Sequence, residues 1–205
     1  MKLYHHPFSS NARKAVMTAL MLGSDVELIV VDLPKGEQKK PPFVALNPNA
    51  KVPVLVDGDL VLWESCAIMA YLADKHGPTP LYPAELRARA DVNRWMYWAI
   101  AHWTPPIGAL NYENFLKPMF GLGERDDSAV ARADREIATF GAILDAHLAG
   151  RTWISGDAVT LADVAVACPL MTTAPAKLPV TAFANVQRWF ARVQQLPAWK
   201  ETSAG

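Results

Sequence analysis

Three short segments of the sequence place polar or backbone groups where they can hold a small charged molecule. The first is residues 7–13, in which Ser9, Ser10 and Asn11 stand at the start of a predicted helix. Hydroxyl groups there lie beside the unpaired N–H groups at the positive end of the helix dipole, which favours an anion. An N-terminal cap formed by Ser9 or Ser10 explains the same residues without a ligand.

The second segment is residues 49–54, in which Pro53 interrupts a predicted strand. Proline cannot donate to a sheet ladder, so Pro53 belongs on an edge or at a special turn, where a cis bond is one solution. An edge strand stopped in this way leaves backbone groups free at Val52, with which a peptide-like ligand can pair. A proline that merely blocks a strand edge is the alternative.

The third segment is residues 63–68, where a predicted hairpin leads into a helix. Ser65 is a natural N-terminal cap, and the N–H groups at that helix start can take a carboxylate. Glu64 beside it can take an ammonium group. The pair therefore suits the α-carboxylate and α-amine of an amino acid, whereas a capped helix with an acidic first turn is the simpler interpretation.

The other reactive side chains lack the spacing of a metal, disulfide or nucleotide site. His5 and His6 are adjacent in a predicted strand, so they point to opposite faces, and the remaining three histidines are scattered. Cys66 and Cys168 form no C-x-x-C pair. Neither a phosphate-binding loop nor a G-x-S-x-G elbow occurs. We expect no metal.

Composition argues against nucleic acid or membrane as the main partner. The 205 residues carry 20 Lys and Arg against 20 Asp and Glu, so no basic surface for nucleic acid or anionic lipid is indicated. The longest apolar run, residues 164–171, is too short to span a bilayer, and no secretory signal precedes the first predicted strand. We therefore expect a cytoplasmic protein that binds small molecules.

The elements that position these segments fall into two groups. The first 76 residues follow the order βαβ, a loop, then ββα, with strands predicted at 2–5 and 26–33 and a hairpin over 55–62. This order predicts a mixed sheet with helices packed on it. The later residues are nearly all helical, including a long helix over 85–118 that Pro105 and Pro106 should kink or break. Thr160 should cap another helix, with Asp163 bonding back.

These motifs, in this order and spacing, resemble a cytosolic glutathione S-transferase over essentially the whole chain. Val52-Pro53-Val54-Leu55 resembles the cis-proline strand of that family, Glu64-Ser65 with Ala67-Ile68 its γ-glutamyl site, and 153–163 its capping motif. The resemblance implies a thioredoxin-like, glutathione-binding domain at 1–78 with a mixed four-stranded sheet, a linker at 79–84 and an all-helical domain at 85–205. It also implies glutathione as co-substrate, a homodimer and a role in detoxification.

The loop Ser-Ser-Asn-Ala-Arg resembles the serine-type classes (delta, theta and phi), in a bacterial style. That resemblance implies that Ser9 holds the glutathione thiolate, with Ser10 as the rival and Asn11 in support. Cys66 and Ala50 depart from the family, because many relatives have arginine and delta members a histidine at these positions. The implied glutathione contacts are Lys39, Lys51, Val52, Pro53, Glu64 and Ser65. The implied walls for the electrophile are Phe8, Trp103, Tyr112 and Phe115.

A serine at a helix start can ionise a thiol without a histidine base. Lowering a thiol pKa of about 8.5 by two units needs roughly 2.7 kcal/mol. A hydroxyl donating to an anion supplies roughly 1.5–3 kcal/mol, and a helix N-terminus adds roughly 0.3–1 kcal/mol. We therefore expect a transferase in which the bound glutathione attacks an apolar electrophile. A glutathione-dependent disulfide reductase and a non-catalytic binding protein on the same fold are the alternatives.

Overall fold

A computed structural model describes residues 1–203, and the chain divides into two compact units. The first unit comprises Met1–Ala84 together with the C-terminal segment that starts at Leu196, and the second comprises Glu85–Gln195. The sequence predicts an all-helical domain over 85–205. The C-terminal segment instead packs within the first unit, where Arg13 holds it.

The first unit contains the predicted mixed sheet of four strands, in the order β2-β1-β3-β4. The strands are β1 (Lys2–His5), β2 (Glu27–Val30), β3 (Val54–Asp57) and β4 (Leu60–Trp63). β1 lies parallel to β2 and antiparallel to β3, and β3 and β4 form the predicted hairpin, which turns at Gly58 with φ 63°. β2 is shorter than the apolar run that predicted it.

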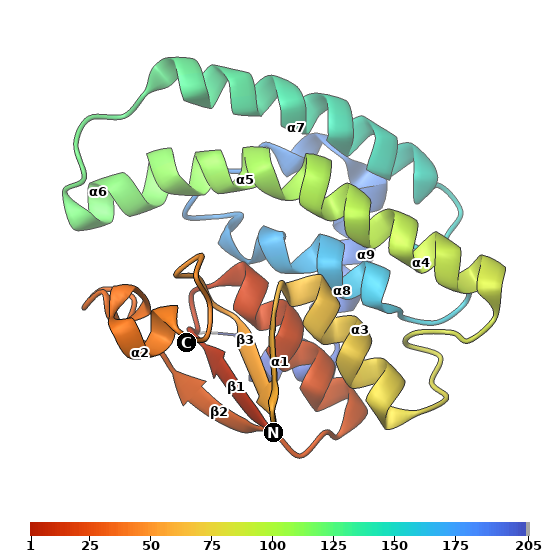
Figure 1. The fold of residues 1–205 in the computed structure, drawn as a ribbon. Helices are drawn as coiled ribbons and strands as arrows, with labels where there is room; N and C mark the ends of the chain where they lie inside the picture. The colour runs from red at the N-terminus through yellow and green to blue at the C-terminus, as the bar shows by residue number, and fades with distance from the viewer. Residues whose placement is uncertain (204–205) are drawn as a thin grey trace. The chain divides into compact units, whose positions relative to one another are not determined.

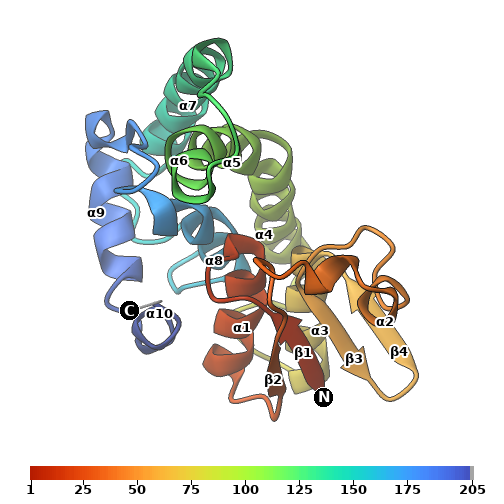
Figure 2. The ribbon, with the colours of Figure 1, turned by 90° about the vertical axis from the view of Figure 1, so that its left-hand side faces the viewer.

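Helices lie on both sides of this sheet. The first unit holds α1 (Ser10–Leu22), a 3₁₀ turn (Glu37–Lys39), α2 (Pro41–Val44), α3 (Ser65–His76) and α10 (Pro197–Glu201). α1 and α2 lie on opposite sides of the sheet (Figures 1 and 2), and α1 packs along α3. α1 ends at Gly23, whose left-handed φ of 61° closes the helix as the sequence predicted. The starts of α1 and α3 carry the first and third candidate segments.

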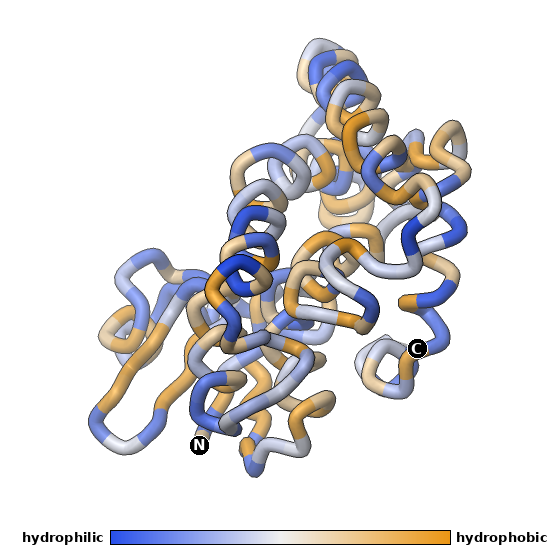
Figure 3. Tube along the Cα trace, turned by 90° about the vertical axis from the view of Figure 1, so that its right-hand side faces the viewer, coloured by the Kyte–Doolittle hydropathy of each residue, from blue (hydrophilic) through white to orange (hydrophobic). Residues whose placement is uncertain are grey.

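The second unit is helical throughout its regular structure. Its helices are α4 (Leu86–Trp98), α5 (Thr104–Asn111), α6 (Lys117–Phe120), α7 (Asp127–His147), α8 (Leu161–Ala167) and α9 (Ala184–Val193). Hydrophilic and hydrophobic residues alternate along the helical coils in Figure 3, as expected where one face is buried. Among residues 1–203 no helix is long and apolar enough to cross a membrane.

The proline pair does not break the long helix of the second unit. A π-helical segment, Ala99–Trp103, joins α4 to α5, and a second one, Tyr112–Leu116, joins α5 to α6. Pro105 and Pro106 lie in the first turn of α5. Their missing N–H groups fall where the wider π-helical turns have already changed the hydrogen-bond register. Of the two predicted outcomes, a kink or a break, the break is absent, and the hydrogen-bond register changes directly before the proline pair.

The predicted capping box is present at the start of α8. The buried Asp163 carboxylate accepts hydrogen bonds from the Thr160 backbone N–H (2.8 Å) and hydroxyl (3.1 Å). It also accepts from Ile154 N–H (2.9 Å) and Trp189 Nε1–H (2.8 Å). Burial raises the pKa of Asp163, and these four donors act in the opposite direction. One carboxylate thus joins α8, α9 and the loop after α7.

Candidate functional site

Ser9 is the N-terminal cap of α1. Its Oγ accepts a hydrogen bond from Ala12 N–H at 3.2 Å, and its backbone has an extended conformation, with φ −92° and ψ 112°. Within residues 1–203 its hydroxyl hydrogen has no acceptor, so the cap leaves that hydrogen available to a ligand. Ser10 is the first residue of the helix, and Ser9 is the residue whose side chain caps it.

Asn11 is exposed and has a buried partner that the sequence did not indicate. Lys14 Nζ donates to Asn11 Oδ1 at 3.0 Å, and the Lys14 side chain has no solvent exposure. The remaining donors of the Asn11 amide are therefore directed away from Lys14. The burial of Lys14 could not be predicted from its neighbours in sequence, because it depends on which face of the helix packs against the rest of the unit.

The Val52–Pro53 peptide bond is cis, which the sequence had offered as one solution for Pro53. The Val52 side chain lies in a core cluster with Ala12, Val31, Phe43 and Val54, so its backbone is held in place. The N–H and C=O of Val52 make no hydrogen bond within residues 1–203. The predicted free backbone groups at Val52 are therefore present, but the predicted edge strand was wrong, because β3 lies inside the sheet between β1 and β4.

A second feature missed in the sequence is Asn47, which fixes the loop before the cis proline. Its Nδ2 donates to the Lys51 carbonyl at 2.7 Å, and its Oδ1 accepts from Asn49 N–H at 3.0 Å. Asn47 is buried, whereas the Lys51 side chain extends into solvent. Lys39, at the end of the 3₁₀ turn, is exposed as well.

Glu64, and not Ser65, is the cap residue of α3. Glu64 has a positive φ of 73° with ψ 114° and makes no cap hydrogen bond, while the buried Ser65 is the first helical residue. The prediction that Ser65 is the cap was therefore off by one position. A non-glycine residue with this backbone costs roughly 1–3 kcal/mol, and Glu64 is exposed at the helix start.

The first turn of α3 offers free backbone donors. The first helical hydrogen bond runs from Ile68 N–H to the Glu64 carbonyl (3.0 Å), so the preceding N–H groups, those of Ser65, Cys66 and Ala67, have no acceptor within the described chain. Burial raises the pKa of the Cys66 thiol, and the charge of Lys14 offsets only part of that increase. Cys66 is therefore a packed thiol and not a reactive one.

The four aromatic residues predicted to contact the electrophile differ in exposure. Phe8 is 66% exposed in the first unit, and Tyr112 is 43% exposed in the second, where Phe115 is partly buried. Trp103 has no exposed surface, donates from Nε1 to the Val166 carbonyl at 3.1 Å and stacks on Trp98. Trp103 is thus part of the helical core and presents no surface to a ligand.

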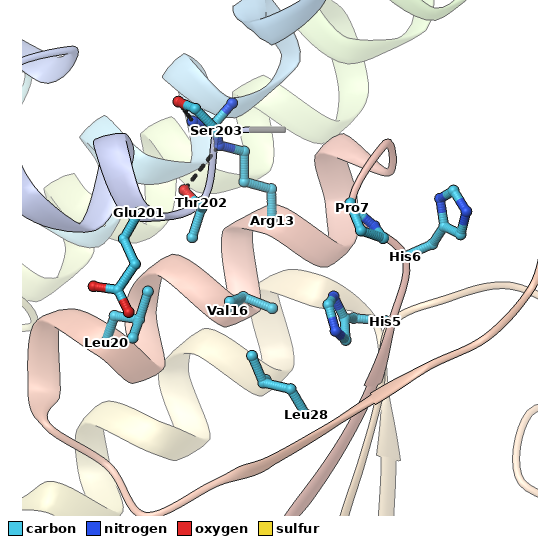
Figure 4. A pocket seen from close by; sticks show the side chains of 10 residues that line it. All are labelled: His5, His6, Pro7, Arg13, Val16, Leu20, Leu28, Glu201, Thr202 and Ser203. Atoms are coloured by element: carbon cyan, nitrogen blue, oxygen red, sulfur yellow. Dashed lines mark hydrogen bonds between the residues drawn. The ribbon is translucent and has the colours of Figure 1, made fainter. Parts of the chain in front are cut away.

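Arg13 binds the C-terminal segment and does not lie among the predicted glutathione contacts. Its Nη2 donates to the Trp199 carbonyl (2.8 Å) and Ser203 Oγ (3.0 Å), its Nε donates to Thr202 Oγ1 (3.1 Å), and the guanidinium lies over the Trp199 ring. Figure 4 shows the contacts of Arg13 with Thr202 and Ser203 beside a cavity of about 340 Å³ lined by β1, α1, β2 and the end of α10. None of the predicted glutathione contacts lines this cavity.

The two histidines at this cavity, His5 and His6, have lowered pKa values. Burial lowers the pKa of His5, with a smaller contribution from His6, and burial also lowers the pKa of His6. Both side chains are therefore mostly neutral at pH 7. Among residues 1–203 no group of three or more His, Cys, Asp and Glu side chains is arranged to hold a metal ion.

Comparisons with known proteins point to one family. Residues 1–74 match the family model "Glutathione S-transferase, N-terminal domain", and residues 98–197 match "Glutathione S-transferase, C-terminal domain". The chain is 35% identical to glutathione S-transferase 3 of Zea mays, covering 100% of this chain and 93% of that protein. It is 31% identical to glutathione S-transferase F10 of Arabidopsis thaliana, covering 97% and 94%. The crystal structure of glutathione transferase F7 from Populus trichocarpa superimposes with a TM-score of 0.89 at 28% identity, covering 98% and 96%.

Proposed function

The chain belongs to the glutathione S-transferase family, and we propose that it joins the thiolate of glutathione to an apolar electrophile while Ser9 holds that thiolate. The observation that carries the proposal is the set of unpaired backbone groups in the first unit. Val52 keeps a free N–H and C=O, and the first turn of α3 keeps three free N–H groups. A peptide with a terminal carboxylate satisfies both sets.

The tripeptide is bound through these groups as follows. Its central residue pairs with the Val52 backbone, beside Pro53, and its γ-glutamyl carboxylate accepts from the first turn of α3, where Ser65 stands. The exposed Glu64 carboxylate receives the γ-glutamyl ammonium. Lys51 and Lys39 are exposed cations that reach the glycyl carboxylate. Each group of the ligand thereby meets a partner of opposite charge or complementary hydrogen bonding.

Ser9 stabilises the ionised sulfur by hydrogen bonding and does not become covalently attached. Because Ser9 Oγ accepts from Ala12 N–H, its own hydrogen is free to donate to the sulfur. The thiol proton passes to solvent, the sulfur lone pair forms the bond to the electrophilic carbon, and any leaving group departs with its electron pair. Asn11 stands at the same helix start and supports the anion. In the first unit, the exposed Phe8 supplies apolar surface for the electrophile.

A pair of serine variants tests the assignment. In Ser9→Ala the pKa of bound glutathione, read from near-ultraviolet thiolate absorbance and from the pH dependence of kcat/KM, should rise by about one to two units, because a hydrogen bond to a charged acceptor is worth roughly 1.5–3 kcal/mol. Ser10→Ala is the matched control and should keep the wild-type profile.

The reverse pattern would move the role to Ser10, and two unchanged profiles would refute a serine mechanism. Reduction of a small mixed disulfide without turnover of an aryl halide would favour the reductase alternative. Failure to bind immobilised glutathione would favour the non-catalytic one.

The assembly and location expected of the family complete the proposal. We propose a homodimer in the cytoplasm, supported by the membership of the chain in this family. Sedimentation velocity on the purified chain tests the assembly, since a single monomeric species across micromolar concentrations would contradict a dimer.

A further inference from the structure

Lys14 is a buried charge without a counter-ion. Its side chain has no exposed surface, and its ammonium group makes one hydrogen bond, to Asn11 Oδ1 at 3.0 Å. Within residues 1–203 no carboxylate lies within ion-pair distance of Lys14. Burying an unpaired ammonium is unfavourable by several kcal/mol, so a protein that keeps one has a use for its charge or leaves it for an anion to compensate.

The ammonium lies at the start of α1, close to the start of α3. Side chains on a helix lean toward its N-terminus, and the bond to Asn11 places Lys14 Nζ beside the first turn of α1. The Lys14 charge also acts on the Cys66 thiol in the first turn of α3, against which α1 packs. The N-termini of α1 and α3, with their free N–H groups, therefore lie near the Lys14 ammonium. Each helix N-terminus carries a partial positive charge, and the ammonium carries a full one.

None of the other ionisable groups described near the starts of α1 and α3 pairs with the buried Lys14 ammonium. Glu64 is exposed at the start of α3, and Cys66 is held neutral by burial. At the end of β1 and just after it, the lowered pKa values of His5 and His6 keep both rings mostly neutral. On the side of α10, the Arg13 guanidinium is bonded to residues 199–203, and Glu201 lies beside Leu20 (Figure 4).

The bond between Lys14 and Asn11 also fixes which way the Asn11 amide faces. A lysine ammonium has donors and no acceptor, so the amide atom 3.0 Å from it must be the oxygen. The Asn11 Nδ2 group, with its two hydrogens, then faces away from Lys14. Asn11 is exposed and lies two residues after Ser9, so this donor is available on the ligand side of the helix start.

We propose that Lys14 is a positioning residue for the glutathione thiolate: it orients the Asn11 amide so that Nδ2 donates toward the sulfur, and it adds a fixed positive charge beneath the site. This inference rests on the proposed function. The ionised thiol, with the γ-glutamyl carboxylate at α3, is the anion that compensates the buried ammonium. The neutral thiol cannot compensate the buried ammonium, so Lys14 favours the ionised form of the sulfur.

The test compares charge-changing variants of Lys14 in the full-length chain with bound glutathione. A unit charge about 10 Å away, through an effective dielectric constant of about 20, shifts a pKa by roughly one unit. Lys14→Met should therefore raise the pKa of bound glutathione by about one unit, which lowers the thiolate fraction near neutral pH up to tenfold. Lys14→Arg keeps the charge and a donor and should stay near wild type. Lys2→Met removes an exposed charge from the same unit and should change nothing.

A second variant keeps the proposal falsifiable if Lys14→Met does not fold. Asn11→Asp alters an exposed residue and places a carboxylate against the ammonium, so it cancels the charge and removes the amide donor. It should raise the thiol pKa by at least as much as Lys14→Met. A merely structural role predicts a lower thermal midpoint with an unchanged thiolate titration in both variants, and that result overturns the proposal.

The failure of this inference is distinguishable from the failure of the proposed function. If Ser9→Ala raises the thiol pKa and the Lys14 and Asn11 variants do not, the serine mechanism stands and the role of Lys14 is wrong. If wild-type chain shows no thiolate signal at saturating glutathione, both are wrong. If Lys14→Arg behaves as Lys14→Met does, charge is not what Lys14 supplies, and the proposal is rejected.

Discussion

Removing the Asp163 carboxylate should destabilise the second unit severely. The change Asp163→Ala takes away the acceptor of three buried donors that cannot turn elsewhere, namely the N–H groups of Ile154 and Thr160 and the Trp189 indole. The Thr160 hydroxyl can rotate to another acceptor and adds little. Each orphaned donor costs about 1–3 kcal/mol, and water entering the vacated space recovers part of that.

We therefore expect Asp163→Ala to lower the free energy of unfolding by about 3–5 kcal/mol, a fall of roughly 10 °C in the thermal midpoint. Asp163→Asn keeps one carbonyl acceptor and should lose about half as much. Urea titration followed by tryptophan fluorescence and by circular dichroism measures both.

A double-mutant cycle with Trp189→Phe isolates one bond. Trp189→Phe alone removes a donor to a charged acceptor and should cost about 1.5–3 kcal/mol. In the Asp163→Ala background the indole N–H is already orphaned, so the same change should cost nothing or stabilise. If Asp163→Ala costs less than about 1 kcal/mol, or if the two changes are additive, the four-donor carboxylate does not hold α8 and α9 together.

Two further perturbations follow from local geometry and from titration. An added Cβ at the buried Gly141 of α7 would lie 2.6 Å from Phe183 Cζ, so Gly141→Ala should destabilise by about 1–3 kcal/mol in urea unfolding. Gly108→Ala on α5 meets open space and should stabilise by up to about 1 kcal/mol; equal effects at the two glycines would contradict the packing argument. Because burial lowers the pKa of His5 below its unfolded value, its contribution to stability is present above about pH 6.5 and is lost as the pH falls through the folded pKa. The thermal midpoint of His5→Gln should accordingly fall less than that of wild type between pH 7 and pH 5, and parallel curves would contradict this.

Local signals predicted the elements that carry the site. Gly23 ends α1 and the Asp57-Gly58 turn joins β3 to β4, because each places a residue that tolerates a left-handed backbone where the chain must turn. Thr160 and Asp163 are close in sequence, so their box could be found there as well. Boundaries and motifs that depend on three or four adjacent residues were therefore predictable.

Long-range packing was not predictable, and it decides much of the site. The cap of α3 shifted from Ser65 to Glu64 because the chain enters that helix with a positive φ that no local preference of glutamate favours. Arg13 binds residues 186 or more positions away, so nothing near it in sequence indicates the contact. The sequence around Lys14 is that of an exposed lysine, and the packing of α1 is what buries it.

The composition of the site explains why its sequence signal is weak at each position. Most of the proposed glutathione contacts are main-chain groups, the N–H and C=O of Val52 and the first N–H groups of α3. Main-chain groups place no demand on side-chain identity beyond the packing that holds them, as the core position of the Val52 side chain shows. The side-chain chemistry that acts on the sulfur is concentrated at the start of α1, where Ser9 caps the helix and Lys14 holds Asn11. Away from the charged side chains of Glu64, Lys39 and Lys51, substitutions that preserve backbone and packing should therefore change glutathione affinity little, whereas changes at the α1 start should alter ionisation of the sulfur.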